Sequence, residues 1–320
     1  MSEKAKQQAE IFRNRLTKRA KHLRRWPTKR GVTCYRLYDR DVPEVPLVVD
    51  RYENWLHVAE YERPHEHTPA EHGDWLDLMV RTAAEVMEIP PADVFLKRRD
   101  RQRGARQYER QSDEQREVVV SEAGLKFLVN LSDYLDVGLF LDHRVTRSMV
   151  GDEAQGKRFL NLFGYTGAFT VHAAAGGAET TTTVDLSKTY LQWAARNLEL
   201  NDLSNPTHRF LRRDALTFLA ESPDEPRYDL AVVDPPTFSN SKSTEDVWDV
   251  QRDHARLLNL LFDRMAPGGV VYFSTQLRRF KLSESELSRV QIREISRRTV
   301  PEDFRNRRIH RCWRLVLLDD

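Results

Sequence analysis

The sequence of 320 residues is poor in cysteine, with only Cys34 and Cys312. Two cysteines are too few for a disulfide framework, and such scarcity is typical of the reducing cytoplasm. Long apolar runs are also absent, since none approaches the roughly 20 residues that cross a bilayer. The first residues, MSEKAKQQAE, lack the apolar core of a signal peptide. We therefore expect a globular cytoplasmic protein with no membrane partner.

An excess of charge of either sign is missing as well, because 51 basic and 49 acidic residues leave a formal charge of +2. The basic residues are nevertheless clustered. Residues 1–30 hold eleven Lys or Arg and two acids, residues 97–110 hold seven and two, and residues 293–314 are rich in Arg. One such cluster is often only a solvated surface, but three favour a polyanionic partner, and a nucleic acid above all.

The first part of the chain carries the pattern of a small mixed domain. A loose apolar stripe among Lys and Arg predicts a basic helix within residues 1–30, which Pro27 should end. Short β-rich runs surround one further helix over residues 31–132, an arrangement typical of an α+β domain, here of an RNA-binding type. The basic segment 97–110 lies between two of these runs and predicts a charged hairpin loop. The expected strands are 33–38, 46–49, 55–61, 93–99, 116–120 and 125–131, and the expected helix is 70–88.

Residues 133–320 show a different rhythm, in which strands and helices alternate. Strict alternation indicates a doubly wound, mostly parallel sheet with right-handed crossovers, and therefore an α/β fold with the smaller α+β domain before it. The expected strands are 157–163, 179–186, 208–213, 228–234 and 268–275, and the expected helices are 168–175, 187–201, 214–221 and 246–265.

Ligands in such folds bind at the carboxyl ends of the strands, so the residues after each strand are the candidates for a site. The first strand runs into NLFGYTG, residues 161–167, whose two glycines allow a tight turn into a helix with free backbone N–H groups. The spacing matches neither GxGxxG nor a P-loop, which disfavours a dinucleotide and a cradled phosphate. An ordinary strand-to-helix turn would show the same pattern.

An acidic residue ends each of the next three strands. Asp185 stands where an acid can bind a ribose diol. Asp214 is either an acceptor for an adenine edge or the N-cap of the next helix. Asp234 closes an apolar strand and is followed by Pro235 and Pro236, which stiffen the loop. A glycine turn and three acids at successive strand ends are more specific together than any one of them.

Taken together, FLNLFGYTG, VDLS, RDAL and DPPTF resemble the class I S-adenosylmethionine-dependent methyltransferases, whose catalytic domain is Rossmann-like. The segments DYLDVGLFLDHR, DVQRDH and DFRNRRIHRCW extend the resemblance to the RlmK half of the bifunctional RlmKL ribosomal RNA methyltransferases. This resemblance implies S-adenosyl-L-methionine as methyl donor, S-adenosyl-L-homocysteine as product, and no metal. It implies a cofactor site formed by Asp142, Arg144, Asn161, Phe163, Gly164, Tyr165, Thr166, Gly167, Asp185, Leu186, Ser187, Asp214, Ala215 and Asp234.

The same resemblance implies a substrate, N7 of a guanine in bacterial 23S ribosomal RNA or in an early large-subunit precursor. The sequence shows no THUMP domain and no second, N2-methylating half, which the fused enzymes carry. We therefore expect the basic clusters, or a separate partner protein, to direct the chain to its RNA. The RNA-binding candidates are Lys97, Arg98, Arg99, Arg101, Arg103, Arg106, Lys242, Arg305, Arg307 and Arg308.

The residues themselves bear on which atom is methylated. Enzymes that methylate cytosine C5 attack the ring with a cysteine, and neither cysteine lies near DPPTF. Exocyclic amines are usually methylated where an aromatic residue directly follows the two prolines, whereas here Thr237 intervenes before Phe238. Guanine N7 offers a lone pair and loses no proton, so its enzyme needs alignment rather than a general base. Methylation of cytosine C5 or guanine N2, and a non-catalytic RNA-binding assembly factor, stay open as alternatives.

Four residues are the catalytic candidates. We expect Asp234 to orient the cofactor or the guanine, Pro235 and Pro236 to fix the loop, and Phe238 to pack against the base. His254, in the helix predicted over 246–265, is interpreted as structural. A small-molecule methyltransferase is disfavoured by the three basic clusters.

Overall fold

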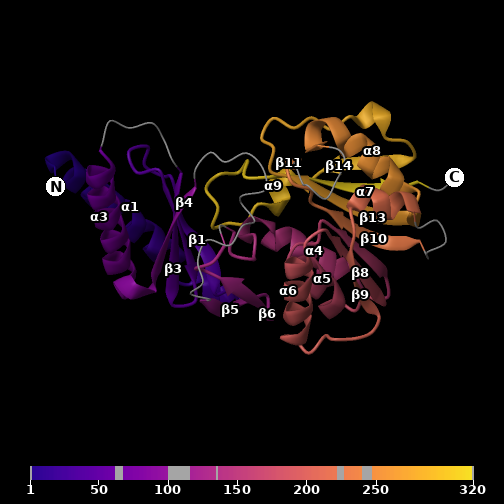
Figure 1. Cartoon of the computed structure of the whole chain (residues 1–320), viewed down its shortest axis with the longest axis horizontal. Coiled ribbons are helices and arrows are strands. Elements are labelled where there is room, and N and C mark those ends of the chain that lie inside the picture. The colour runs from indigo at the N-terminus through magenta and orange to yellow at the C-terminus, as the bar shows by residue number, and fades with distance from the viewer. Residues whose placement is uncertain are drawn as a thin grey trace. The chain divides into compact units, whose positions relative to one another are not determined.

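The computed structural model describes residues 2–61, 68–99, 116–134, 136–221, 227–239 and 247–318, and contacts divide the chain into two compact units (Figure 1). The first unit comprises Met1–Gly124, Val129–Val137 and Glu302–Asn306, and the second comprises Leu125–Leu128, Gly138–Pro301 and Arg307–Asp320. The sequence suggested single cuts after residues 30 and 132. By contacts, the basic N-terminal helix shares the first unit with the small sheet, and a short C-terminal segment returns to it.

The first unit contains a four-stranded sheet. Its elements are β1 (Cys34–Asp39), β2 (Leu47–Tyr52), β3 (Trp55–Tyr61), α3 (Pro69–Met87), η1 (Pro91–Asp93) and β4 (Val94–Arg99). The strand order is β1-β2-β3-β4, in which the first two pairs are antiparallel and β4 runs parallel to β3. A parallel pair needs a long crossover, and α3 with η1 provides it.

The basic N-terminal helix is α1 (Glu3–Leu23), and a short helix, α2 (Trp26–Arg30), follows it. The sequence suggested that Pro27 ends the first helix, but Pro27 lies in the first turn of α2, where its fixed φ fits and its missing N–H costs no bond. Phe12 of α1 is fully buried in one apolar cluster with Trp75 of α3. No helix in the described part of the chain is both long and apolar enough to cross a membrane.

The strands on either side of the basic segment 97–110 are not paired with each other. β4 pairs with β3, while β5 (Glu117–Glu122) and β6 (Leu125–Asn130) form a separate two-stranded sheet. The predicted charged hairpin is therefore wrong, because β4 completes the parallel edge of the larger sheet. Residues 100–115 lie outside the described residues.

The second unit contains a seven-stranded sheet with helices on both faces. Its elements are η3 (Leu141–His143), α4 (Arg144–Glu153), β7 (Arg158–Leu162), α5 (Ala168–Ala175), β8 (Thr180–Asp185), α6 (Lys188–Glu199), β9 (His208–Arg212), α7 (Ala215–Glu221), β10 (Tyr228–Val233), β11 (Phe238–Ser239), β12 (Trp248–Asp249), α8 (Val250–Phe262), β13 (Met265–Thr275), η4 (Glu284–Glu286), β14 (Val290–Glu294), α9 (Ser296–Thr299) and β15 (Arg311–Leu317). The strand order is β14-β15-β13-β10-β7-β8-β9. The strands from β13 to β9 are parallel, and β15 is antiparallel to both of its neighbours. The predicted α/β fold with a doubly wound, mostly parallel sheet is confirmed.

The central strand β10 shows how the sheet is covered on both faces. Ala231 and Val233 pack with α7 and α8, whereas Leu230 and Val232 pack with α4 and α5. Figure 1 shows α7 and α8 on one side of this sheet and α4, α5 and α6 on the other. Because successive side chains of a strand point to opposite faces, a strand buried on both faces must be apolar throughout.

The direction of winding reverses between β7 and β10. From β7 the chain proceeds outward to β8 and β9, and it then returns to β10 on the other side of β7. Ligands in doubly wound sheets bind outside the carboxyl ends of the two strands that flank such a reversal. We call this place the switch point. Residues 163–167 follow β7 and Asp234 follows β10, so both reach the switch point.

Candidate active site

The loop after β7, residues 163–167, holds an uncommon backbone conformation. Phe163 and Tyr165 have positive φ angles of 55° and 48°, although neither is glycine. The hydroxyl of Thr166 anchors the loop by donating to the carbonyl of Gly138 at 2.5 Å. Strained backbone of this kind persists only where the surroundings impose it, and it is concentrated at functional sites.

The two glycines of this loop are required by close packing. A Cβ on Gly164 would lie 2.3 Å from Cγ2 of Thr183 in β8. A Cβ on Gly167, whose φ is +72°, would lie 2.6 Å from Cβ of Ala194 in α6. Real Cβ atoms do not approach other atoms so closely. The loop therefore presses directly against β8 and α6, and the backbone sets its shape.

Asp185, at the end of β8, is joined to this loop through backbone amides. The N–H of Tyr165 donates to Oδ2 at 2.9 Å and that of Ser187 to Oδ1 at 2.8 Å, with Leu186 between. Burial raises the pKa of Asp185 above its ordinary value, and these amides oppose the rise. The two oxygens offer about four lone-pair sites, more than the backbone amides use, so the half-buried carboxylate can also accept from a ribose hydroxyl. Ser187 also caps α6 by accepting from the N–H of Tyr190.

Two further predicted cofactor residues are used within the fold. Asn161, at the end of β7, is buried and its Nδ2 donates to Oγ1 of Thr170 at 3.0 Å. Asp214 precedes α7, and its Oδ2 accepts from the N–H of Thr217 at 2.9 Å. This is the N-cap that the sequence allowed, and it places the buried Ala215 in the first turn. The second oxygen of Asp214 keeps the predicted adenine contact open.

Asp234 is the carboxylate at the switch point. Its side chain is 21% exposed, and Oγ of Ser274 in β13 donates to Oδ1 at 2.7 Å. The Nε2 atom of His143 lies 3.3 Å from Oδ2. The two partners that the structure describes for Asp234, Ser274 and His143, can both be neutral. Among these described interactions, no guanidinium or ammonium group offsets the charge of the carboxylate.

The segment after Asp234 is fixed at the prolines and open beyond them. Pro235 is buried, and the carbonyl of Pro236 accepts from the indole N–H of Trp248 at 2.7 Å. The Trp248 ring also lies 5.8 Å from the ring of Phe163. Phe238, in β11, is 46% exposed. A rigid turn therefore presents an uncovered aromatic ring beyond the carboxylate.

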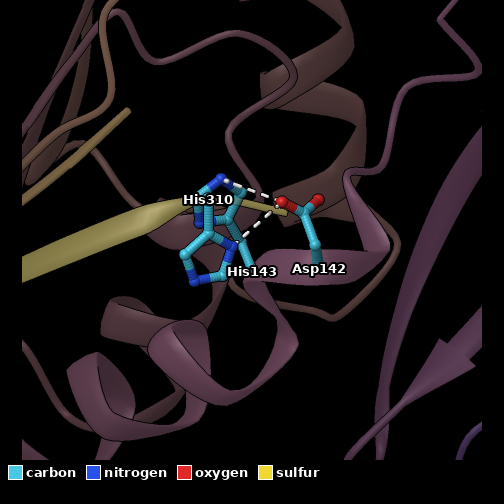
Figure 2. Close-up of side chains that lie close together, drawn as sticks. All are labelled: Asp142, His143 and His310. Carbon is cyan, nitrogen blue, oxygen red and sulfur yellow. Dashed lines mark hydrogen bonds and ion pairs between the residues drawn. The ribbon is translucent and has the colours of Figure 1, made fainter. Parts of the chain in front are cut away.

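Asp142 and Arg144, two of the implied cofactor residues, lie in the interior. They are 5% and 7% exposed, at η3 and at the start of α4. Oδ2 of Asp142 is 3.0 Å from Nδ1 of His310 and 3.7 Å from Nε2 of His143. Figure 2 shows both contacts meeting at one carboxylate oxygen, with the two imidazole rings stacked beside it.

Three residues in this group were not among the predicted site residues: His143, His310 and Ser274. His143 stands in LDHR between two residues that were selected, so a histidine flanked by motif residues was the available signal. His310 lies 168 positions from Asp142, and Ser274 lies 40 positions from Asp234. Only the sheet, which brings β10, β13 and β15 side by side, reveals those contacts.

The predicted RNA-binding residues fall into four groups. Arg305, Arg307 and Arg308 are exposed. Lys97 is buried and its ammonium donates to the carbonyl of Ser132, which leaves it little access to a ligand. Arg98 and Arg99 end β4, and nothing further is described of their side chains. The other four lie outside the described residues: Arg101, Arg103, Arg106 and Lys242.

Comparison with known proteins shows what this arrangement belongs to. The sequence profile of the S-adenosylmethionine-dependent methyltransferases matches residues 76–279. The chain belongs to this family. A ribosomal RNA large subunit methyltransferase K from Neisseria meningitidis serogroup B is 47% identical over 305 residues, which cover 95% of this chain and 86% of that protein. A ribosomal RNA large subunit methyltransferase K/L from Pseudomonas putida KT2440 is 53% identical over 310 residues, 97% of this chain. This chain spans 42% of the length of that K/L protein.

Solved structures share the fold. A methyltransferase crystallised in complex with SAH has a TM-score of 0.77 and 22% identity, and the match covers 97% of this chain and 82% of that one. The cofactor of the methyltransferase is S-adenosyl-L-methionine. The switch point suits this molecule, because a loop without room for Cβ atoms, the Asp185 carboxylate, which could accept from a ribose diol, and a second carboxylate meet there. When bound, the cofactor supplies an electrophilic methyl group on a sulfonium ion.

Proposed function

We propose that this methyltransferase modifies N7 of a guanine in 23S ribosomal RNA. The observation that carries the proposal is the partly exposed Asp234 carboxylate at the switch point, held by Ser274 and His143. The K relative, which matches nearly the whole chain, supports a large-subunit ribosomal RNA substrate. Such a substrate implies that the protein acts in the cytoplasm.

A carboxylate suits methylation of guanine at N7 for a geometric reason. Guanine offers N–H donors at N1 and N2, whereas N7 lies on the opposite edge of the base. If Asp234 accepts from the N–H edge, the lone pair of N7 faces away from the carboxylate and toward the methyl donor. The reaction makes the base cationic, and a fixed negative charge beside it stabilises that product-like state. No proton has to leave, so alignment is the main requirement.

Phe238 and the two prolines complete the base site in this proposal. Pro235 and Pro236 fix the turn, and the exposed ring of Phe238 gives a face on which a purine can stack. The major-groove edge of a paired guanine is inaccessible in A-form RNA. The enzyme therefore acts on an unpaired or opened guanine, in naked ribosomal RNA or an early large-subunit precursor.

The alternative of cytosine C5 methylation lacks a nucleophile. Both cysteines of the sequence, Cys34 and Cys312, are fully buried. Burial raises the pKa of the Cys312 thiol above its ordinary value, so it stays protonated at neutral pH. Attack on a pyrimidine ring needs an accessible thiolate.

Guanine N2 is the second candidate, because a carboxylate beside an exocyclic amine can also take up a proton. That candidate is favoured by the same residue, Asp234, with His143 behind it. It is weakened by the order of Thr237 and Phe238, which puts the aromatic ring one position later than amine-methylating sites usually have it.

RNA binding is assigned to the basic clusters, with the exposed Arg305, Arg307 and Arg308 as the described contributors. Contacts to phosphates make affinity fall with salt, and each arginine lost should reduce the steepness of that fall. A separate partner protein that helps to select the RNA is compatible with the share of the K/L proteins that this chain spans.

The decisive experiment uses radiolabelled S-adenosyl-L-methionine and 23S ribosomal RNA from cells that lack their own N7 methylation. The purified chain should label this RNA, and digestion should release 7-methylguanosine. Ribosomal RNA that already carries the mark is the matched control and should accept no label. Assembled 50S subunits should be poorer substrates than naked RNA.

The identity of the labelled nucleoside separates the candidates. Recovery of N2-methylguanosine would replace N7 by N2 on the same base. Recovery of 5-methylcytidine would contradict the roles given to both cysteines. Binding of 23S RNA without any transfer, when the cofactor is bound, would favour the non-catalytic assembly factor.

A further inference from the structure

Within the second unit, a row of polar side chains leads from Asp234 into the interior. His143 lies 3.3 Å from Asp234, Asp142 lies 3.7 Å beyond it, and His310 follows at 3.0 Å. Nε2 of His310 is 2.9 Å from Oγ1 of Thr299 at the far end. Asp234 is the partly exposed member, and the other four are at most 5% exposed. Burying polar groups costs free energy of folding unless they are hydrogen-bonded. We therefore asked what this row of side chains could do.

The first question is whether the row holds a metal ion. Asp142, His143 and His310 each offer a ligand atom, and these atoms lie within 4.8 Å of one another. However, the two imidazole rings are stacked, with centroids 4.7 Å apart and an interplanar angle of 11° (Figure 2). An ion bound by a histidine lies close to the plane of its ring, and one ion cannot lie in two parallel, separated planes. The geometry disfavours a shared metal.

The second question is where the protons lie. Burial lowers the pKa of His143 below its ordinary value, while Asp234 and Asp142 oppose this, and the ring is neutral at pH 7. Carboxylates only accept, so the nitrogen that faces Asp234 and Asp142, Nε2, carries the single proton. Neither ring nitrogen of His143 makes a hydrogen bond with a described group, so Nε2 stands in close contact with Oδ2 of Asp234 at 3.3 Å rather than bonded to it. A small movement of either side chain would close that bond when the site is filled. The Nδ1 proton of His310 is likewise directed at Asp142.

We propose that His143 is a positioning residue for methyl transfer, which uses its neutral Nε2–H to hold the Asp234 carboxylate in place without cancelling its charge. Asp142 faces the same Nε2 atom at 3.7 Å, and the His310 ring stacks on the His143 ring, so both limit the orientation of the imidazole. Besides these acids and His310, the groups that face His143 are the Phe169 ring, 5.9 Å away, and the cation of Arg147. The inference rests on the role given to Asp234 above, but not on which guanine atom is methylated.

The neutrality of this donor has a catalytic consequence. A cation beside Asp234 would neutralise the carboxylate before the base arrives, and less of its field would reach the methylated purine. A neutral N–H fixes the direction of the carboxylate and leaves nearly its full charge for the transition state. Residues that orient metal ligands through hydrogen bonds contribute about 10- to 100-fold in activity, and we expect a similar order for a residue that orients a reacting carboxylate.

Two substitutions of His143 separate this role from simple packing. H143L keeps the apolar bulk and removes the donor, so kcat for 23S RNA should fall about 10- to 100-fold. H143Q places an amide N–H close to where Nε2 stands, and kcat should recover to within about threefold of the wild type. KM for S-adenosyl-L-methionine should change less than about twofold in both. In the D234N background, H143L should cause little further loss, because its effect acts through Asp234.

His254 supplies the matched control. It is also buried, in α8, with Nδ1 2.9 Å from the carbonyl of Val250 and Nε2 accepting from the N–H of Ser283. H254L should lower the thermal midpoint as much as H143L does, or more, and leave kcat unchanged. A shared fall in kcat for both variants would reduce His143 to a packing residue.

The outcomes distinguish this inference from the proposed function. If D234N is fully active, the role of Asp234 fails, and this inference fails with it. If D234N is inactive while H143L is as active as the wild type, only this inference fails. Equal loss in H143L and H143Q would overturn it in favour of a steric role. One equivalent of bound metal, with activity abolished by a chelator and restored by that metal, would overturn it in favour of a metal site.

Discussion

The two sides of the switch point are built in different ways. The side proposed to bind the cofactor, which we call the cofactor side, consists of residues 163–167 and Asp185. It is held mainly by the main chain, since amides donate to the acid and the glycines leave no room for Cβ atoms, while the Thr166 hydroxyl adds one side-chain anchor. On the side proposed to face the acceptor base, which we call the acceptor side, Asp234 is held by side chains, with Ser274 and His143 in contact with it.

The two sides should therefore tolerate different kinds of substitution. A loop shaped mainly by its backbone tolerates changes in side-chain chemistry, apart from the Thr166 anchor, better than changes in conformation. A carboxylate positioned by side chains depends on single atoms, such as Nε2 of His143, and a conservative replacement that keeps the atom should suffice. The cofactor is common to the whole family, whereas the acceptor side must match one base atom, so it is expected to carry the selectivity.

The largest effect is expected on the acceptor side. D234N keeps the shape of the side chain and removes the charge, so kcat should fall about 100- to 1,000-fold. The fold and the affinity for S-adenosyl-L-homocysteine should stay within a few-fold of the wild type. Single-turnover transfer to 23S RNA and calorimetric titration measure the two quantities. A D234N variant with normal transfer would remove Asp234 from the catalytic residues.

On the cofactor side, the matching disruption is a methyl group. G164A would place Cβ 2.3 Å from Cγ2 of Thr183, so the loop has to move. We expect a loss of about 1–3 kcal/mol in the free energy of unfolding and a large loss of cofactor affinity. G73A is the matched control, because Gly73 lies within α3 with nothing within 4 Å of an added Cβ. It should stabilise the protein by about 0.5–1 kcal/mol. Normal cofactor binding by G164A would contradict the packing argument.

Asp185 tests the side chain within that backbone frame. D185N keeps a hydrogen-bonding group but weakens its bonds to a ribose diol and to the amides of Tyr165 and Ser187. The Kd for S-adenosyl-L-homocysteine should rise about 10- to 100-fold, while kcat at saturating cofactor stays near the wild type. A fall in kcat alone would move Asp185 from binding to chemistry.

The cofactor side was the more predictable from sequence, and its construction explains why. Glycines, an acid at a strand end and a short loop are local in the chain, and the alternation of elements by itself places them at strand ends. The acceptor side depends on His310 and Ser274, which reach Asp142 and Asp234 only through the order β10-β13-β15. No periodicity encodes that order. The prediction of a charged hairpin was wrong for a similar reason. β4 pairs with β3, to which a helical crossover connects it, and not with the strand that follows the basic segment.

A smaller effect is expected at Asp214, which the sequence left between two roles. D214A removes the N-cap and should cost about 1 kcal/mol in the free energy of unfolding. D214S restores a capping oxygen but is too short to reach an adenine, so stability should recover while the Kd for the cofactor rises about threefold or more. Full recovery of both by D214S would leave Asp214 as a cap alone.

The smallest effect contrasts Asp234 with a carboxylate that has a cation. Burial raises the pKa of Glu153, but hydrogen bonds from Arg314 and Tyr272 hold it below its ordinary value. A depressed folded-state pKa contributes stability above the unfolded value, about 4.3, and loses it as the pH falls through the folded value. In E153Q, unfolding by urea between about pH 5 and pH 3 should therefore depend less on pH, with under about 1 kcal/mol lost at pH 7. Methyl transfer should be unchanged, because the charge of Glu153 is already offset by the Arg314 guanidinium and cannot stabilise a cationic base. A kcat for E153Q as low as that of D234N would show that charge compensation does not separate the two acids.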